Sequence, residues 1–267
     1  MAKHSAPKRN SLPAPQVRDF RQLLDEALDA TDEKGRKWAD AQWGCYAFYD
    51  YDDEPIYVGQ TNERLRTRVR RHLTNQRTDA VAMRILDVFE VAKIELWPLW
   101  EFEKVAGVGK ETKEALAAKK KQLDAVEYTA YLKAIKKSKF GAILNEKIPP
   151  LSEAVTLPAS QEFLLISEDT RRERGHADIR IARRAETISR LAAVAHERGE
   201  VSDGLRRVLV VQAARLAYLA ASRLAFVEGR PEPAAAAIDV EALVGTLLKE
   251  HRVQPSLEED SEEPETD

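Results

Sequence analysis

The fold is decided by the stretch Gly44-Cys-Tyr-Ala-Phe-Tyr-Asp-Tyr-Asp-Asp-Glu-Pro-Ile-Tyr-Val-Gly59. Its first six residues are mostly apolar and aromatic, its middle is an acidic turn ending at Pro55, and a second short apolar run follows at once. Two such runs separated by a turn are typical of a β-hairpin. We therefore expect two antiparallel strands here.

The segments after the hairpin predict an α+β domain. An Arg-rich helix begins near Asn62 or Glu63 and continues to about Thr74, residues 91–99 alternate as a third strand would, and residues 111–137 have the apolar spacing of a long helix. We expect a small three-stranded antiparallel sheet flanked by helices. Pro149 and Pro150 then interrupt the ordered run.

The rest of the chain divides by composition. We expect a disordered basic arm at 1–16, a helix and connector at 17–42, the α+β domain at 43–150, an all-helical accessory domain at 160–252, and a disordered acidic tail at 253–267. Within the accessory domain, residues 161–198, 203–227 and 240–251 are predicted to be helical, and no strand pattern is visible.

Composition excludes several classes of protein. The single cysteine, Cys45, rules out an intramolecular disulfide and a Cys-rich zinc site. The sequence contains no run of about 18 apolar residues, so we expect no membrane-spanning helix. We expect a soluble, cytoplasmic protein without a membrane partner. The net charge of −3 includes seven acids after residue 253, so the remainder carries +4. A polyanionic partner is therefore compatible with the charge.

Six residues of chemical interest follow one another in a fixed order. They are Tyr46 in Gly44-Cys-Tyr46, Tyr57 in Tyr57-Val-Gly59, Arg68, His72, Glu127 and Asn145. This order resembles the GIY-YIG nuclease family over about residues 43–150. The departures, Cys45 and Val58 in place of isoleucines, are apolar and do not touch the chemistry.

The resemblance implies a role for each residue. Tyr46 would be the general base with help from His72, Arg68 would stabilise the transition state, and Tyr57 would orient water or phosphate. Glu127 would hold Mg²⁺ or Mn²⁺ through oxygen, and Asn145 would maintain the site by hydrogen bonds. A tyrosine has a pKa near 10, so nearby positive charge would have to lower the pKa of Tyr46.

Each of these residues alone also fits an ordinary structural role. The tyrosines could be sheet residues, Arg68 a solvated helix charge and His72 a packed histidine. Glu127 is more informative because it lies between apolar positions of the long helix, which predicts that it reaches the buried face. The combined order favours the functional interpretation for the whole set.

Basic residues indicate where nucleic acid would bind. Arg64, Arg66, Arg70 and Arg71 surround Arg68 without an intervening acid, and Lys136 with Lys137 forms a second, weaker patch. We expect these residues to contact phosphates.

Two hypotheses about function follow. The first is a divalent-metal-dependent endonuclease that hydrolyses phosphodiester bonds of duplex or branched DNA, in restriction, homing or repair. The alternative is a catalytically inactive nuclease-like module that binds DNA or a partner. The apolar stripe from Val208 to Phe226 predicts either a helical hairpin or a homodimer interface through the C-terminal helices.

Overall fold

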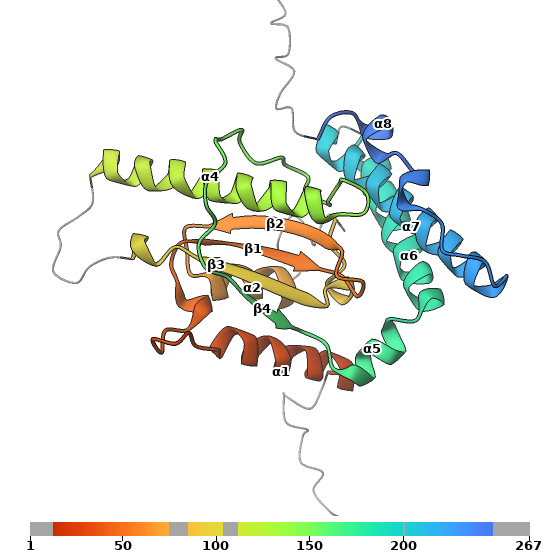
Figure 1. The fold of residues 1–267 in the computed structure, drawn as a ribbon, viewed down its shortest axis with the longest axis horizontal. Coiled ribbons are helices and arrows are strands. Elements are labelled where there is room, and N and C mark those ends of the chain that lie inside the picture. The colour runs from red at the N-terminus through yellow and green to blue at the C-terminus, as the bar shows by residue number, and fades with distance from the viewer. Residues whose placement is uncertain (1–12, 75–84, 104–111, 200, 248–267) are drawn as a thin grey trace, which may run out of the picture.

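The structure is a computed structural model that describes residues 13–74, 85–103, 112–199 and 201–247 (Figure 1). Before the hairpin lie helix α1 (Pro15–Asp29) and the short 3-10 helix η2 (Trp38–Asp40). The predicted helix at the N-terminus is confirmed, but it begins two residues inside the segment expected to be a disordered arm. Residues 1–12 of that arm and the acidic tail lie outside the described residues.

The predicted hairpin is confirmed. Strand β1 (Gly44–Tyr49) pairs antiparallel with β2 (Pro55–Thr61), and β1 also pairs antiparallel with β3 (Lys93–Pro98). In this register Tyr46 lies opposite Gly59 on one side and Leu96 on the other. Strand β1, which lies between β2 and β3, is buried along its whole length, as its aromatic and apolar sequence predicts.

The sheet has four strands, not the three we expected. Strand β4 (Gln161–Leu164) pairs antiparallel with β3 and completes the order β2-β1-β3-β4. It comes from the stretch that was expected to be helical. Its side chains are mostly exposed, so the sequence lacks the apolar alternation by which a strand is recognised.

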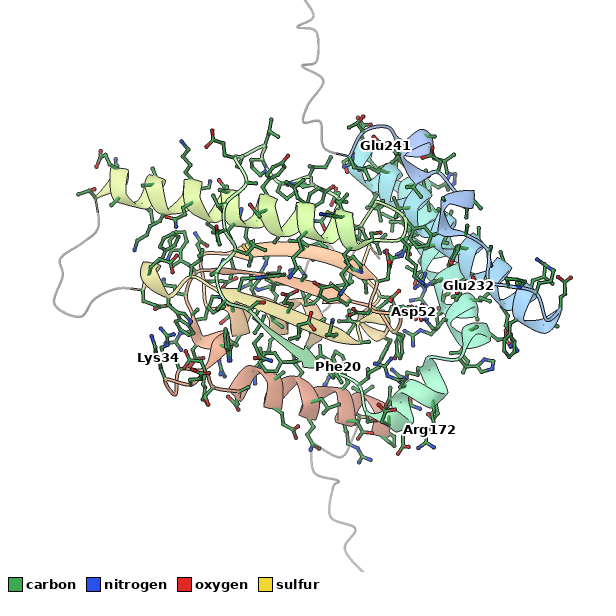
Figure 2. All side chains as sticks on the ribbon, viewed as in Figure 1. Phe20, Lys34, Asp52, Arg172, Glu232 and Glu241 are labelled. Carbon is green, nitrogen blue, oxygen red and sulfur yellow. The ribbon has the colours of Figure 1, made fainter. Side chains whose placement is uncertain are left out.

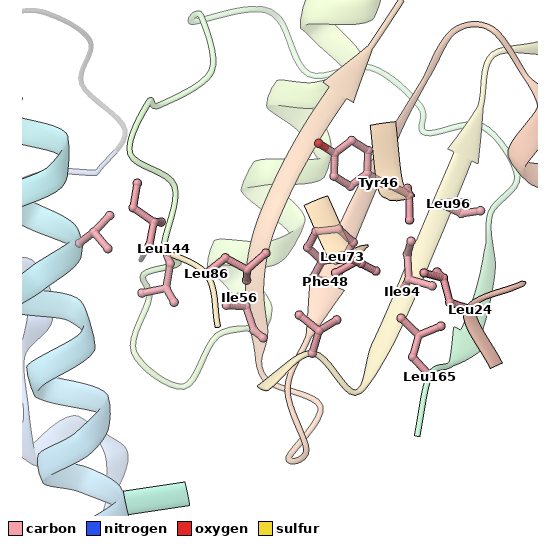
Figure 3. Packing of buried hydrophobic residues seen from close by; sticks show 14 of the residues in the cluster. Leu24, Tyr46, Phe48, Ile56, Leu73, Leu86, Ile94, Leu96, Leu144 and Leu165 are labelled. Carbon is pink, nitrogen blue, oxygen red and sulfur yellow. The ribbon is translucent and has the colours of Figure 1, made fainter. Parts of the chain in front are cut away.

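Helices cover both faces of the sheet. Alternate residues of β1 point to opposite faces, so Cys45, Ala47 and Tyr49 pack under helix α4 (Lys113–Lys137). Tyr46 and Phe48 point the other way, toward α1 and helix α2 (Leu65–Thr74), in a core shared with Ile94 and Leu96 (Figure 3). Short 3-10 helices η3 (Val88–Glu90) and η4 (Trp100–Phe102) flank β3.

The C-terminal part is mainly helical, as predicted. It contains α5 (Glu168–Arg174), α6 (Ala177–Arg198), α7 (Asp203–Val227), the 3-10 helix η5 (Ala235–Ala237) and α8 (Val240–Val244). Helices α6 and α7 lie against each other beside the sheet (Figure 1). Helix α7 has the predicted bounds, whereas α8 is shorter than the expected helix at 240–251.

The C-terminal helices are joined to the sheet domain by buried charges. Asp50, at the end of β1, accepts hydrogen bonds from Arg180, Arg184 and Arg215 at 3.1, 2.7 and 3.4 Å. Arg180 also donates to Asp52 in the β1–β2 turn, which faces α6 (Figure 2). Together with β4, these bonds connect the C-terminal helices to the sheet.

Helix α7 is long and apolar enough to cross a membrane by length and composition alone. Its inner side, however, carries the buried polar residues Gln212 and Arg215, and Arg215 donates a hydrogen bond to the carbonyl oxygen of Pro55. This side of α7 is therefore the packed face of a helix in a folded core.

Candidate active site

The hydroxyl of Tyr46 is the centre of a polar cluster inside the sheet domain. It lies 2.8 Å from Nε2 of His72, and Nε of Arg68 donates to it at 3.4 Å. The ring of Tyr57 lies 6.3 Å from the Tyr46 ring and 5.6 Å from that of His72, measured between centroids. Four of the six predicted residues are therefore brought together.

Gly59 makes room for this cluster. A Cβ atom at this position would lie 2.6 Å from the hydroxyl oxygen of Tyr46, which is closer than non-bonded atoms approach. Because Gly59 faces Tyr46 in the strand register, the glycine ending the second tripeptide lets the tyrosine of the first extend across β2. The two tripeptides are thus two halves of one packing arrangement.

Helix α2 presents Arg68 and His72 on one side. The two residues are four apart, so their side chains lie on the same helix face. The helix is anchored by the buried side chains of Leu65, Val69 and Leu73, and the backbone N–H of Leu65 donates to the carbonyl of Ala41. The spacing alone predicted this convergence correctly.

The imidazole of His72 is neutral at neutral pH. Burial, together with the smaller effects of the Arg68 and Arg71 charges, lowers the pKa of His72 to about 4. Its Nε2 atom can therefore accept a hydrogen bond from the Tyr46 hydroxyl. The Nδ1 atom is buried without a hydrogen-bond partner among the described residues.

The expected lowering of the Tyr46 pKa is wrong for this structure. Burial raises the pKa of Tyr46 well above its ordinary value, the proximity of Tyr57 adds to the rise, and the opposing effect of Arg68 is smaller. Tyr46 is therefore protonated, and its hydroxyl can donate to Nε2 of His72 in the tautomer that carries the ring proton on Nδ1. The sequence could show the positive charges but not the complete burial that outweighs them.

Glu127 approaches the same edge of the sheet from α4. It is 9% exposed, which confirms that it reaches the buried face. Burial and the neighbouring Asp124 raise the pKa of Glu127 to about 8, against the smaller opposing effects of Gln60 and Arg68. Because β2 is an edge strand, side chains from both faces of the sheet can meet around it near Gly59.

Two residues near Glu127 were not recognised in the sequence. Nε2 of Gln60 donates to Oδ1 of Asp124 at 2.7 Å, and both groups influence the pKa of Glu127. Gln60 directly follows Tyr57-Val-Gly59, and Asp124 precedes Glu127 by one helical turn. Their positions next to the tyrosine tripeptide and one turn before Glu127 were the sequence signals by which the two residues could have been found.

Asn145 fixes β2 from its free side. Its Oδ1 accepts from the backbone N–H of Val58 at 3.0 Å, and its Nδ2 donates to the carbonyl of Val58 at 2.7 Å. Asn145 is thus a structural support for the tripeptide that carries Tyr57. All six predicted residues now lie around one edge of the sheet.

Comparison with known proteins agrees with this geometry. Residues 42–105 match the family model of the GIY-YIG catalytic domain. Over these residues the chain is similar to the GIY-YIG nucleases. No curated protein and no solved structure gave a significant match.

The match covers the two tripeptides and helix α2, and it ends before α4. It supports nuclease activity on nucleic acid and a divalent metal as cofactor, as is general for GIY-YIG nucleases. Glu127 and Asn145 lie beyond the matched residues, so their place in the site rests on the contacts described above.

The residues around Glu127 suit a hard divalent cation. Glu127 and Asp124 offer carboxylate oxygens, and Oε1 of Gln60 is a buried acceptor without a partner among the described residues. No group of three or more His, Cys, Asp or Glu side chains arranged to hold a metal occurs among the described residues. One or two carboxylates are nevertheless the usual protein share for Mg²⁺, which keeps waters and phosphate oxygens as its other ligands.

Three of the arginines around Arg68 form ion pairs that the sequence did not indicate. Arg66 bonds to Asp29, Asp40 and the carbonyl of Leu28, Arg70 pairs with Asp25, and Arg71 pairs with Glu63. Most of these acids come from α1 and the connector after it. Binding of DNA by these arginines stays a prediction, but each has a structural partner already.

Arg64 is exposed and makes no side-chain hydrogen bond or ion pair with the described residues. In the second patch Lys136 is exposed, whereas Lys137 donates to Asp53 in the β1–β2 turn at 2.6 Å. Arg64 and Lys136 are therefore the predicted DNA contacts whose charges are available in this structure.

Proposed function

We propose that this protein is a divalent-metal-dependent endonuclease that hydrolyses phosphodiester bonds of duplex DNA. The observation that supports it most is the position of the Tyr46 hydroxyl between His72 Nε2 and Arg68 Nε. A hydroxyl placed between a neutral acceptor and a fixed cation is suited to moving a proton beside a phosphate. Glu127 lies at the same edge of β2 and would hold the metal.

The proton relay would begin with an attacking water molecule. As the water oxygen forms a bond to phosphorus, its proton passes to the Tyr46 oxygen, and the tyrosine's own proton passes to Nε2 of His72. Neutral His72 can accept this proton, so Tyr46 acts as a base without first becoming a free phenolate. The bond from phosphorus to the leaving oxygen breaks, and that oxygen is finally protonated from the solvent or the relay.

Arg68 would stabilise the negative charge that develops during attack. Its guanidinium is half-buried and always protonated, and burial strengthens its interaction with an oxyanion. Tyr57 would orient water or phosphate next to Tyr46. A cation bound at Glu127 would neutralise phosphate charge and assist the leaving oxygen.

The decisive assay uses supercoiled plasmid with Mg²⁺ or Mn²⁺, repeated with EDTA. We expect metal-dependent nicking by the wild-type protein. Glu127→Gln should reduce cleavage by orders of magnitude while DNA binding survives. The neutral amide matches the shape of the protonated carboxyl, so the fold should be retained. The matched control is Glu241→Gln, which changes an exposed glutamate on α8 and should leave cleavage unchanged.

The outcomes separate the two functional hypotheses. Normal cleavage by Glu127→Gln at low Mg²⁺ would show that the metal ligand is another residue. Retarded but uncut plasmid with every metal would favour the inactive DNA-binding module. A branched junction tested beside linear duplex would show whether DNA structure governs the substrate.

A further inference from the structure

The N-terminal half of α4 extends beyond the sheet that its C-terminal half covers (Figure 1). The buried residues of this helix begin at Leu123, and Leu116, two turns earlier, is 48% exposed. Since Leu116 and Leu123 are seven residues apart, they lie on nearly the same side of the helix. The sheet-facing side of α4 therefore continues past the sheet into the open.

This projecting segment is basic. Between Lys113 and Lys121 the sequence Lys-Glu-Ala-Leu-Ala-Ala-Lys-Lys-Lys contains four lysines and one acid. Lys119 bonds back to the sheet domain by donating to the carbonyl of Phe102 at 2.8 Å. Lys113 and Lys120 are exposed, and neither forms an ion pair with a described residue.

Lys113 and Lys120 are aligned with the predicted metal ligand. Lys113, Lys120 and Glu127 are separated by seven residues each, which is close to two helical turns. All three therefore lie along one side of a single continuous helix. The rise between neighbours is about 10.5 Å, the length of roughly three base-pair steps of B-DNA.

We propose that the DNA bound at Glu127 continues along this side of α4 and that Lys113 and Lys120 contact its phosphates. This inference rests on the proposed function and specifies the path of its substrate. A lysine is a point charge on a flexible stem, so the contacts would position duplex DNA without reading its sequence. The rigid helix would fix the distance between the bound duplex and the bond to be cut.

The test measures binding of a labelled 30-base-pair duplex in Ca²⁺ over a series of salt concentrations. The double variant Lys113→Gln with Lys120→Gln should weaken binding and reduce the log–log salt slope by about 2, or about 0.9 per lost contact. Hydrolysis of bis(p-nitrophenyl) phosphate in Mn²⁺ should stay at the wild-type rate, because this small substrate reaches Glu127 without the lysines.

Two controls match the change in charge. Lys34→Gln with Arg172→Gln removes two positive charges from residues far from α4 (Figure 2), and it should leave the slope within about 0.5 of wild type. The single variants Lys120→Gln and Lys121→Gln differ only by about 100° around the helix, and the first should have the larger effect.

Equal slopes for the double variant, its control and wild type would overturn the proposal. So would equal effects of Lys120→Gln and Lys121→Gln. If wild-type protein binds the duplex with the predicted lysine dependence but cuts nothing with any metal, the nuclease proposal fails while the DNA path along α4 stands.

Discussion

The side chain of Asn145 forms two hydrogen bonds with the backbone of Val58, accepting from its N–H at 3.0 Å and donating to its carbonyl at 2.7 Å. An asparagine thus occupies the place where a fifth strand would continue the sheet beyond β2. Both groups of Val58 would otherwise be unpaired edge positions of the strand that carries Tyr57.

We expect Asn145→Ala to destabilise the protein by about 2 kcal/mol, because it leaves two buried backbone groups of Val58 unsatisfied. The measurement is the free energy of unfolding from urea titration. Asn62→Ala, at an exposed position, is the control and should change it by less than about 0.5 kcal/mol. Equal stability of Asn145→Ala and wild type would contradict a supporting role for this residue.

Arg68 should differ from its neighbours in what its loss changes. Arg68→Ala should lower the cleavage rate even at saturating DNA, since Arg68, unlike Arg66 and Arg70, donates to the Tyr46 hydroxyl. Changing Arg66 and Arg70 together to alanine should weaken affinity and reduce the log–log salt slope by about 1 per lost contact.

The ion pairs of Arg66 and Arg70 give this comparison a second readout. The double variant of Arg66 and Arg70 has a lower free energy of unfolding if these arginines hold α2 against α1. If, in addition, the salt dependence of its DNA binding equals that of wild type, the two arginines do not contact DNA. A loss of rate at saturating DNA as large as that of Arg68→Ala would overturn the division of roles.

The protonation of His72 should make stability depend on pH. The folded-state pKa of His72, about 4, lies below the ordinary value of 6.5, so the unfolded chain binds the proton more readily. The resulting stability is present above pH 6.5 and is lost as pH falls toward 4, by about 3 kcal/mol. We would measure unfolding free energies of wild type and His72→Gln from pH 7 to pH 4. A constant difference between them would contradict the low pKa.

The elements nearest the two tyrosine tripeptides were predictable because their own sequences indicate their structure. The hairpin consists of two short apolar runs around an acidic turn, α2 is an Arg-rich amphipathic segment, and the two tripeptides fix the order of these elements. Strand β4 could not be predicted because its neighbours in the sheet, and not its own composition, make it a strand. Its pairing with β3 depends on contacts nearly seventy residues apart in the chain.

The burial of individual charged and titratable side chains was harder to predict from the sequence than the identity of the site residues. Arg180 and Arg215 are of a residue type that usually lies at the solvated surface, yet each is 2% exposed. Their burial depends on Asp50, which is more than a hundred residues away. The same limit applies to Tyr46, since its pKa depends on how completely neighbouring elements exclude water.

The buried charges predict that the sheet and the C-terminal helices unfold together. Asp50→Asn leaves Arg215 buried without its anion and should cost about 3–5 kcal/mol. The control is Asp169→Asn, whose partner Arg172 is exposed, and it should cost less than about 1 kcal/mol.

All four tryptophans lie between residues 38 and 100, so their fluorescence reports on the sheet domain, while far-ultraviolet circular dichroism includes α6 and α7. The two signals should change in one transition. Two separate transitions would show that the C-terminal helices unfold as an independent domain.

We expect the protein to form a homodimer through the C-terminal helices. One Glu127-centred site cuts one phosphodiester bond at a time, and a break in both strands needs two sites related by the two-fold symmetry of the duplex. The inner part of the apolar stripe, including Val208, is buried within the protomer, but Leu224 and Phe226 at the end of α7 are 53% and 75% exposed. A dimer would therefore use this end of the helix.

Light scattering of the full chain should give about 60 kDa, twice the 30.1 kDa of one chain. Leu224→Ser with Phe226→Ser should give a monomer that nicks plasmid but rarely linearises it, whereas Leu151→Ser, at a 63% exposed position, should behave like wild type. These substitutions test the interface better than a fragment ending near Ser160, because such a fragment lacks β4 and the partners of Asp50. A full-length protein that stays monomeric at tens of micromolar, with and without DNA, would exclude the dimer and leave the exposed end of α7 without a role in cleaving the second strand.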